Sequence, residues 1–437
     1  MVTKQRFHGI LKAMENKIKI GLIGLGTVGS GVYKTLQDFK NIEIVKIAVR
    51  NKSKKRNIEG LDESILTEDP YEVVNNPEIQ IVAELIGGLN PAFDIIKTAI
   101  KNGKHIVTAN KELLAKNGEE LFNFAEQYNK VVLYEAAIAG GIPLIMPIKT
   151  ILAGNKISKI KAILNGTTNY ILTKMDVQGA SYDSVLKEAQ ELGYAEANPT
   201  GDVEGFDAAY KITTLATIAF GQRIKIDKVY REGITKIRPE DMQAANEMGY
   251  KIKLIASAEL SEDGRADVRV HPMLVPHTKT LAHINYVTNA VSLTGHPVGD
   301  VTLSGPGAGE FPTASSVVGD ILAIASELDK TDYLLPMMRC HHEKNANMMD
   351  ISETENKYYL SITAENAKGV IAKIGKACEE NNISLASIVQ KEIASGNVAK
   401  ITVITELCLE KDMQNVINIF NTDPSSMHVD SLIRVQI

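Results

Sequence analysis

One pattern in the first part of the chain constrains its fold more than any other feature. Between Lys17 and Tyr134, short apolar runs rich in β-branched residues alternate with amphipathic stretches. The expected strands are Ile18–Ile23, Ile42–Val49, Ile79–Ile86, His105–Thr108 and Val131–Tyr134. The expected helices are Val28–Asp38, Pro91–Asn102 and Lys111–Tyr128. This alternation predicts βαβ units, and hence an α/β domain with a Rossmann-type, doubly wound parallel sheet.

The remaining residues follow a different order of elements. Longer strand-like runs and two strongly helical stretches (181–192 and 206–220) predict an α+β substrate and oligomerisation domain. The C-terminal residues alternate as β-α-β-β-α-β, which is a ferredoxin-like pattern. The expected segments are an N-terminal extension (1–16), a nucleotide-binding domain (17–142, completed by 305–340), a catalytic and dimerisation domain (143–304), a linker (341–356) and a C-terminal domain (357–437).

Composition excludes several functional classes. The 48 Lys and Arg residues against 53 Asp and Glu residues give a net charge of -5, so we expect neither a nucleic-acid nor a membrane-surface partner. The three cysteines show no CxxC spacing, which disfavours a disulfide framework and favours a reducing, cytoplasmic location. The first 17 residues lack the apolar segment of a secretion signal, and no apolar run is long enough to span a bilayer.

A glycine-rich motif follows the first expected strand and precedes a helix. It contains, in order, Gly24, Leu25, Gly26, Thr27, Val28 and Gly29. In this context GxGxxG is a dinucleotide-binding fingerprint, because glycines permit a tight turn and a close backbone approach, and the helix N-terminus attracts the pyrophosphate. A glycine-rich turn that binds no ligand is the alternative interpretation.

The end of the second expected strand bears on the choice of cofactor. An acidic residue there accepts hydrogen bonds from the ribose of NAD, but this strand ends in Arg50 and continues through four further basic residues. We therefore expect NADP(H) to be preferred and NAD(H) to be possible, with Arg50 clamping the 2′-phosphate. A basic loop that is merely solvated is the alternative.

The densest polar cluster lies between Ala189 and Lys211. Four acidic residues precede the lysine: Glu196, Asp202, Glu204 and Asp207. On a helix, Asp207 and Lys211 share one face, so the carboxylate can orient the lysine. Such a lysine can donate a proton to a carbonyl oxygen during reduction, and the other carboxylates can bind a substrate ammonium. An exposed cluster of capping residues and salt bridges would show the same spacing.

This segment resembles the homoserine dehydrogenase signature. The matching positions are Ala189, Gly193, Tyr194, Asn198, Pro199, Asp202, Val203, Gly205, Asp207 and Lys211. The resemblance continues through residues 108–111, 135–143, 165–169 and 305–314. It implies reversible NAD(P)-dependent reduction of L-aspartate 4-semialdehyde to L-homoserine, a step towards threonine, methionine and isoleucine.

The same resemblance assigns roles to individual residues. Lys211 matches the proton donor, and Lys111 matches a second lysine between cofactor and substrate. The implied substrate-binding residues are Glu196, Asp202, Asp207, Lys111 and Thr167, and the further cofactor-binding residues are Lys111, Gly193 and Gly307. A monovalent cation, Na⁺ or K⁺, is implied at Glu135, Ile138, Gly140 and Ile142, although these residues alone would indicate a glycine-rich hinge.

The C-terminal unit resembles an ACT domain, which binds amino acids. An effector such as threonine is implied at residues 365–369, where Asn366 and Lys368 replace the usual Asp and Pro. A packing or dimerisation module without a ligand is the alternative. We expect a homodimer or a homotetramer.

Two other functions compete with this interpretation. An aspartate-semialdehyde dehydrogenase needs a nucleophilic cysteine, but all three cysteines lie at or beyond Cys340, outside the expected catalytic domain. A non-catalytic sensor of NADPH and amino acids would not need Lys111, Lys211, Glu196 and Asp207. No kinase segment precedes the nucleotide-binding fold, so a fusion with aspartate kinase is not expected.

Overall fold

The computed structural model describes residues 17–328, 340, 342, 344–392, 398–422 and 427–436. The expected extension, residues 1–16, lies outside these residues. The chain forms two compact units. Unit 1 comprises Met1–Ser158, Tyr210–Ile226 and Thr294–Asn345, and unit 2 comprises Lys159–Ala209, Asp227–Leu293 and Ala346–Ile437.

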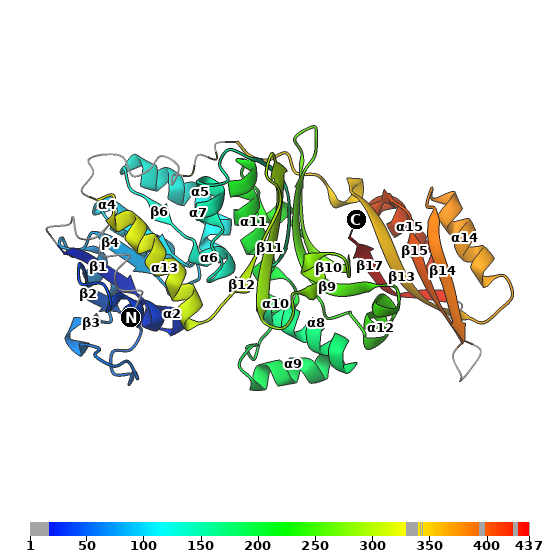
Figure 1. Ribbon diagram of the computed structural model, residues 1–437, viewed down its shortest axis with the longest axis horizontal. Coiled ribbons are helices and arrows are strands. Elements are labelled where there is room, and N and C mark those ends of the chain that lie inside the picture. Colours follow the sequence, from blue (N-terminus) through cyan, green and yellow to red (C-terminus); the bar gives the residue numbers. More distant parts are fainter. Residues whose placement is uncertain are drawn as a thin grey trace. The chain divides into compact units, whose positions relative to one another are not determined.

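Unit 1 contains a parallel sheet of six strands in the order β3-β2-β1-β4-β5-β6. The strands are β1 (Ile18–Ile23), β2 (Ile42–Ala48), β3 (Leu66–Thr67), β4 (Ile81–Glu84), β5 (His105–Thr108) and β6 (Val132–Leu133). Strand order reverses on either side of β1, as in a doubly wound sheet. The predicted Rossmann-type fold is confirmed (Figure 1).

Seven helices lie wholly within the described residues of unit 1. They are α2 (Thr27–Leu36), α3 (Pro70–Val74), α4 (Ala92–Lys101), α5 (Lys111–Gln127), α6 (Ala136–Ala139), α7 (Ile145–Lys149) and α13 (Glu310–Ala325). Far apart in the sequence, α2 and α13 pack side by side because Gly31 lacks a side chain. A Cβ on Gly31 would lie only 2.6 Å from the carbonyl oxygen of Glu310.

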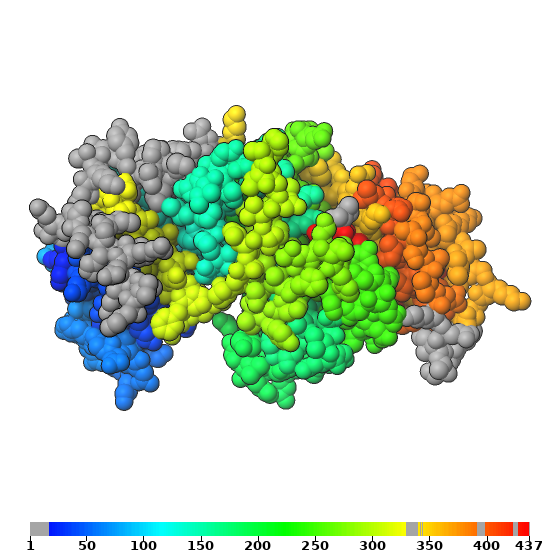
Figure 2. Space-filling model, viewed as in Figure 1, coloured from blue at the N-terminus to red at the C-terminus, as the bar shows by residue number. Residues whose placement is uncertain are grey.

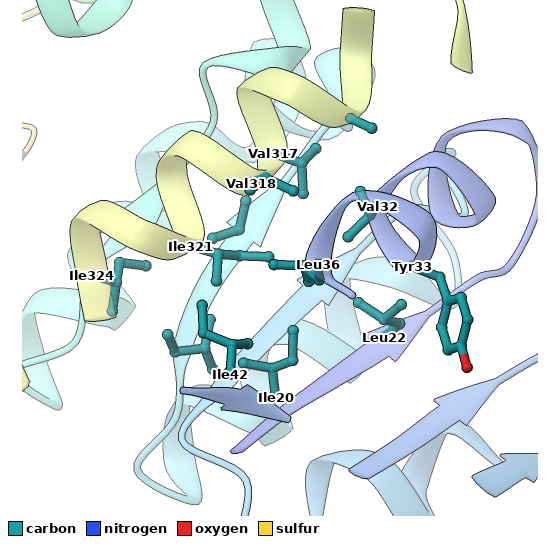
Figure 3. Packing of buried hydrophobic residues seen from close by; sticks show 14 of the residues in the cluster. Ile20, Leu22, Val32, Tyr33, Leu36, Ile42, Val317, Val318, Ile321 and Ile324 are labelled. Carbon is teal, nitrogen blue, oxygen red and sulfur yellow. The ribbon is translucent and has the colours of Figure 1, made fainter. Parts of the chain in front are cut away.

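The core of unit 1 joins the sheet to these two helices. Figure 3 shows Val317, Val318 and Ile321 of α13 directed towards Leu36 of α2 and Ile20 of β1. All five side chains are buried, so the hydrophobic effect favours their association. Helix α13 therefore belongs to the nucleotide-binding fold, although almost the whole of the substrate domain's sequence precedes it.

Unit 2 is built on a mixed sheet. Its strands lie in the order β11-β7-β9-β10-β17-β13-β15-β14, with β8 beside β10 and β16 beside β13. The strands before the C-terminal part are β7 (Lys156–Ile163), β8 (Tyr230–Arg231), β9 (Tyr250–Leu260), β10 (Ala266–Pro276) and β11 (Thr288–His296); β12 (Gly299–Pro306) follows along the chain. The helices are α8 (Gly166–Gln178), α9 (Tyr182–Glu191), α10 (Thr200–Val203), α11 (Phe206–Phe220), which crosses into unit 1, and α12 (Pro239–Glu247).

The C-terminal part has the predicted βαββαβ order. Its elements are β13 (Glu355–Glu365), α14 (Val370–Glu380), β14 (Leu385–Glu392), β15 (Val398–Thr405), the short β16 (Cys408–Leu409), α15 (Glu410–Phe420) and β17 (Met427–Val435). Strand β17 pairs with β13 on one side and, in parallel, with β10 on the other. Figure 2 shows the corresponding surface, where green atoms adjoin orange and red ones. The C-terminal domain therefore shares one sheet with the strands that precede it.

Helix α8 was not expected from the sequence. Side chains on several of its faces are buried, among them Thr168, Asn169, Tyr170, Ile171 and Leu172. A helix buried on most sides has no polar face, so the 3.6-residue alternation that reveals a surface helix is weak. Among the described residues, no helix is long and apolar enough to cross a membrane.

Candidate active site

The glycine motif forms the turn between β1 and α2. The backbone at Gly24 has φ +107°, and a Cβ on Gly29 would lie 2.2 Å from the carbonyl oxygen of Gly24. Gly26 is the N-cap of α2, and nothing lies within 4 Å of a Cβ built on it. The positive φ requires glycine at position 24, and the close approach of the Gly24 carbonyl oxygen requires it at position 29. The open space at Gly26 leaves room for a phosphate at the helix N-terminus.

The basic loop after β2 is held by Arg56. Its guanidinium donates hydrogen bonds to the carbonyl oxygens of Asn51 (2.7 Å), Lys52 (3.4 Å) and Lys54 (2.8 Å). Arg50 is exposed, two residues beyond the carboxyl end of β2. Arg56 therefore shapes the loop, and Arg50 lies where a doubly wound sheet receives the ribose of a dinucleotide.

Lys111 begins α5, directly after β5. The side chain of Asn110 is the N-cap, because its Oδ1 accepts a hydrogen bond from the N–H of Leu113 at 3.2 Å. Lys111 is partly exposed, and it lies beyond the carboxyl end of β5, at the sheet edge where open α/β sheets bind ligands. Because the Asn110 cap fixes the first turn of α5, it also fixes the backbone of Lys111.

Two predicted carboxylates meet at Asn165 in unit 2. The Asn165 amide donates to Asp202 Oδ1 at 2.7 Å and to Asp207 Oδ2 at 2.9 Å. Asn165 Oδ1 accepts from the N–H of Thr168 and caps α8. The cap fixes the amide and the amide holds the two acids side by side, although their residue numbers differ from that of Asn165 by 37 and 42.

Of the other predicted residues, Gly193 and Glu196 lie in the exposed loop after α9, and Thr167 lies in the first turn of α8. Glu196 is exposed, and among the described residues it is not a partner of the Asn165 amide. Thr167 donates a hydrogen bond from its hydroxyl to the carbonyl oxygen of Tyr194 at 2.7 Å. Gly193 has φ +76°, a conformation that favours glycine and turns the chain after α9. The structure thus brings Asp202 and Asp207 together at Asn165, whereas Glu196 is exposed.

Lys211 follows Asp207 by one turn of α11. Its residue is only 8% exposed, so its ammonium lies in a largely buried environment. In unit 1 the neighbouring Tyr210 lies beneath the Lys116 ammonium of α5, 5.4 Å from it, and Arg223 forms an ion pair with Glu119 of the same helix. These contacts associate α11 and the residues just after it with α5, whose first residue is Lys111.

The segment from Glu135 to Ile142, where a cation is expected, is held by hydrogen bonds to nearby and distant residues. The Glu135 carboxylate accepts hydrogen bonds from the N–H groups of Leu144, Ile145 and Met146, the start of α7. The Gly140 carbonyl oxygen accepts the Ser316 hydroxyl at 2.6 Å, and a Cβ on Gly140 would clash with the backbone of Gly307. Na⁺ and K⁺ prefer oxygen ligands. The Glu135 carboxylate and the Gly140 carbonyl oxygen supply such oxygens, but both already accept hydrogen bonds that stabilise the fold.

A second carboxyl group lies beside Glu135. Asp320 is buried and accepts the N–H of Glu135 at 2.8 Å. Burial raises the pKa of Asp320 well above its usual range, and the negative charge of Glu135 adds to the effect.

Comparison with known proteins identifies the family to which this chain belongs. Family models described as homoserine dehydrogenase, as its NAD-binding domain and as an ACT domain match residues 143–322, 24–135 and 358–423. A homoserine dehydrogenase from a Synechocystis species is 42% identical over 431 residues, which cover 96% of this chain and 99% of the relative. This chain belongs to the homoserine dehydrogenase family. As a homoserine dehydrogenase it is an NAD(P)-dependent oxidoreductase, and the resemblance drawn from its sequence is confirmed.

Solved homoserine dehydrogenases share its architecture. The crystal structure from Thiobacillus denitrificans has a TM-score of 0.90 at 39% identity and covers 96% of this chain and 98% of that one. A hyperthermophilic archaeal homoserine dehydrogenase mutant, described in complex with NADPH, has a TM-score of 0.61 at 26% identity; the match covers 72% of this chain and 99% of that one.

Sequence reasoning assigned no role to Asn165 or to Glu84. Asn165 has a recognisable signal, because an Asn between a strand and a helix is a common N-cap, but a cap alone does not predict two acidic partners. Glu84 ends an apolar strand and is wholly buried. A charged residue at the end of such a strand indicates a specific buried interaction.

Proposed function

We propose that the chain interconverts L-aspartate 4-semialdehyde and L-homoserine, with NADP(H) preferred over NAD(H). A bound NADPH would supply the hydride that the aldehyde carbon receives. The Lys211 ammonium would give a proton to the carbonyl oxygen, so that the aldehyde becomes an alcohol. The supporting observation is the pair of acids held by Asn165, one of which lies one helical turn before the buried Lys211.

The substrate's charges suit the proposed residues. Asp207 and Glu196 would bind the substrate ammonium, with Asp202 and Thr167 beside them. Two adjacent carboxylates repel one another, so a cation placed between them is attracted strongly. Lys111 and Lys211 would stabilise the negative charge that develops on the reacting oxygen.

Turnover of the purified full-length chain tests this function. We expect homoserine to reduce NADP⁺, and aspartate 4-semialdehyde to oxidise NADPH, both followed by the absorbance of reduced nicotinamide. The absence of turnover with either cofactor, from neutral to mildly alkaline pH, would contradict the proposal.

The role of Arg50 yields a separate prediction. Arg50→Ala should weaken NADPH binding by about tenfold or more and change NADH binding little, because a charge-assisted contact to the 2′-phosphate is lost. Equilibrium titration with each cofactor measures this. Lys101→Ala is the matched control, since it removes one exposed positive charge at the last residue of α4. Equal weakening of NADPH and NADH would remove Arg50 from the 2′-phosphate.

We also propose three accompanying features. A monovalent cation would be held by Glu135, Ile138, Gly140 and Ile142, where it would stabilise the segment between the two domains. An amino acid such as threonine would bind near residues 365–369, where the Asn366 oxygen accepts a hydrogen bond from Gln390 at 3.2 Å. The assembly would be a homodimer or a homotetramer, which light scattering can determine.

A further inference from the structure

Glu84, the last residue of β4, accepts three hydrogen bonds close to the glycine turn. Its side chain is wholly buried. Its Oε1 accepts the N–H groups of Ile86 at 2.9 Å and Gly87 at 3.0 Å. Its Oε2 accepts the hydroxyl of Thr108, the last residue of β5, at 2.7 Å. One carboxylate thus joins the ends of two neighbouring parallel strands.

The bonds of Oε1 shape the backbone opposite the glycine turn. The N–H of Leu85 donates to the carbonyl oxygen of Ile23 at 2.8 Å, and a Cβ on Gly24 would lie 3.0 Å from the Leu85 oxygen. The loop that follows Glu84 is therefore in direct contact with the dinucleotide fingerprint. Its conformation decides how much space a bound dinucleotide finds beside Gly24.

The bond of Oε2 leads to the start of α5. Thr108 Oγ1 accepts a hydrogen bond from the N–H of Asn110 at 3.0 Å, and the same hydroxyl donates a hydrogen bond to Glu84. The Asn110 side chain caps α5 and also donates to the carbonyl oxygen of Gly88 at 2.6 Å. Thr108 and Asn110 thereby connect the carboxylate to the residue directly before Lys111.

A carboxylate suits this position better than any neutral side chain. Three donors converge on it, and only an ionised carboxyl group accepts all three without offering a proton of its own. A buried carboxylate is costly unless it is hydrogen-bonded, as it is here. The amide of a glutamine would instead direct an N–H at Thr108, whose hydroxyl proton would lose its acceptor.

We propose that Glu84 is a positioning residue with two separable effects. Its Oε1 sets the loop beside the glycine turn and so acts on cofactor affinity. Its Oε2, through Thr108 and Asn110, sets the first turn of α5 and so acts on the Lys111 ammonium during the chemical step. The second effect rests on the proposed function, whereas the first is measurable without turnover.

Thr108 isolates the bond of Oε2. Thr108→Val has nearly the same shape but no hydroxyl, and we expect kcat to fall by about tenfold to a hundredfold while the Kd for NADPH stays within about twofold. Thr108→Ser restores the hydroxyl and should recover most of kcat. Thr98→Val is the matched control, since it removes a hydroxyl that donates within α4, to the carbonyl oxygen of Asp94.

Variants of Glu84 test both bonds. Glu84→Gln keeps an oxygen for Ile86 and Gly87 but reverses the bond to Thr108, so it should behave like Thr108→Val. Glu84→Ala removes both sets of bonds and should also weaken NADPH binding by about tenfold. Binding is followed by the fluorescence of NADPH, which reports affinity even in a chain that does not turn over.

Two results would overturn the proposal. One is a Thr108→Val variant with lowered thermal stability but wild-type kcat, which would give the network a purely structural role. The other is a Thr108→Ser variant as impaired as Thr108→Val. If Glu84→Ala does not fold, the Thr108 pair decides the question alone. A wild-type chain that binds NADPH but lacks turnover would instead contradict the proposed function.

Discussion

Lys211→Met is expected to lower kcat by about 10² to 10⁴-fold and to change the Kd for NADPH by less than about twofold. Methionine has similar length and fills the largely buried space, so the substitution removes a proton donor without leaving a large cavity. If the ammonium acts only in the chemical step, its loss appears in kcat and leaves cofactor binding intact. Steady-state kinetics in both directions, with NADPH titration, measure the two quantities.

Two further variants sharpen this test. Lys211→Arg keeps the positive charge but donates a proton poorly, because a guanidinium stays protonated throughout the accessible pH range. It should therefore remain as slow as Lys211→Met. Lys225→Ala, at an exposed position just beyond α11, is the control for the loss of one positive charge. Parallel losses of kcat and NADPH affinity in Lys211→Met would place the lysine in a structural role.

Arg434→Met is expected to destabilise unit 2 by about 3 to 5 kcal/mol, the cost of leaving one partner of a buried ion pair alone. The Arg434 side chain on β17 is wholly buried. It donates to Glu410 at 2.8 and 3.0 Å and to Glu232 at 3.0 Å. Burial by itself would lower the pKa of Arg434, but these two carboxylates outweigh it and raise the pKa above its ordinary value. Without the arginine, the Glu410 carboxylate remains buried and uncompensated.

Chemical denaturation of the full chain measures this loss. Adding Glu410→Gln to Arg434→Met should recover part of the stability, because it removes the unpaired charge. Arg265→Met is the matched control. Its ion pairs with Asp263 and Glu353 are partly exposed, so its removal should cost less than about 1 kcal/mol. An Arg434→Met variant as stable as Arg265→Met would contradict the prediction.

This buried cluster also connects two regions of unit 2. Arg434 and Glu410 lie in the C-terminal βαββαβ part, of which residues 358–423 match the ACT model, whereas Glu232 follows β8, in the region that matches the homoserine dehydrogenase model. With the pairing of β10 and β17, the cluster makes the ACT domain continuous with the strands before it.

Much of the fold follows from local sequence patterns. The alternation of strands and helices predicts the parallel sheet of unit 1, and the βαββαβ order predicts a ferredoxin-like C-terminal unit; both are confirmed. The resemblance of that unit to an ACT domain is confirmed by the family match. The expected helix 206–220 coincides with α11. Helix α8 escaped prediction because its burial removes the periodicity, and the β10–β17 pairing escaped because no pattern within either strand specifies a distant partner.

The residues that organise the candidate site divide in the same way. The sequence alone predicts the glycine turn and the spacing that places Asp207 and Lys211 one turn apart on a helix. The structure gives the reason for two of the glycines, because a positive φ at Gly24 and the crowding at Gly29 exclude side chains. Only the tertiary structure joins Glu84 to Thr108, Asn165 to Asp202, and Arg434 to Glu232, across separations of 24, 37 and 202 residues. Periodicity and backbone conformation act between near neighbours in the chain, whereas a buried polar group takes whichever partner the packed fold brings within hydrogen-bonding distance.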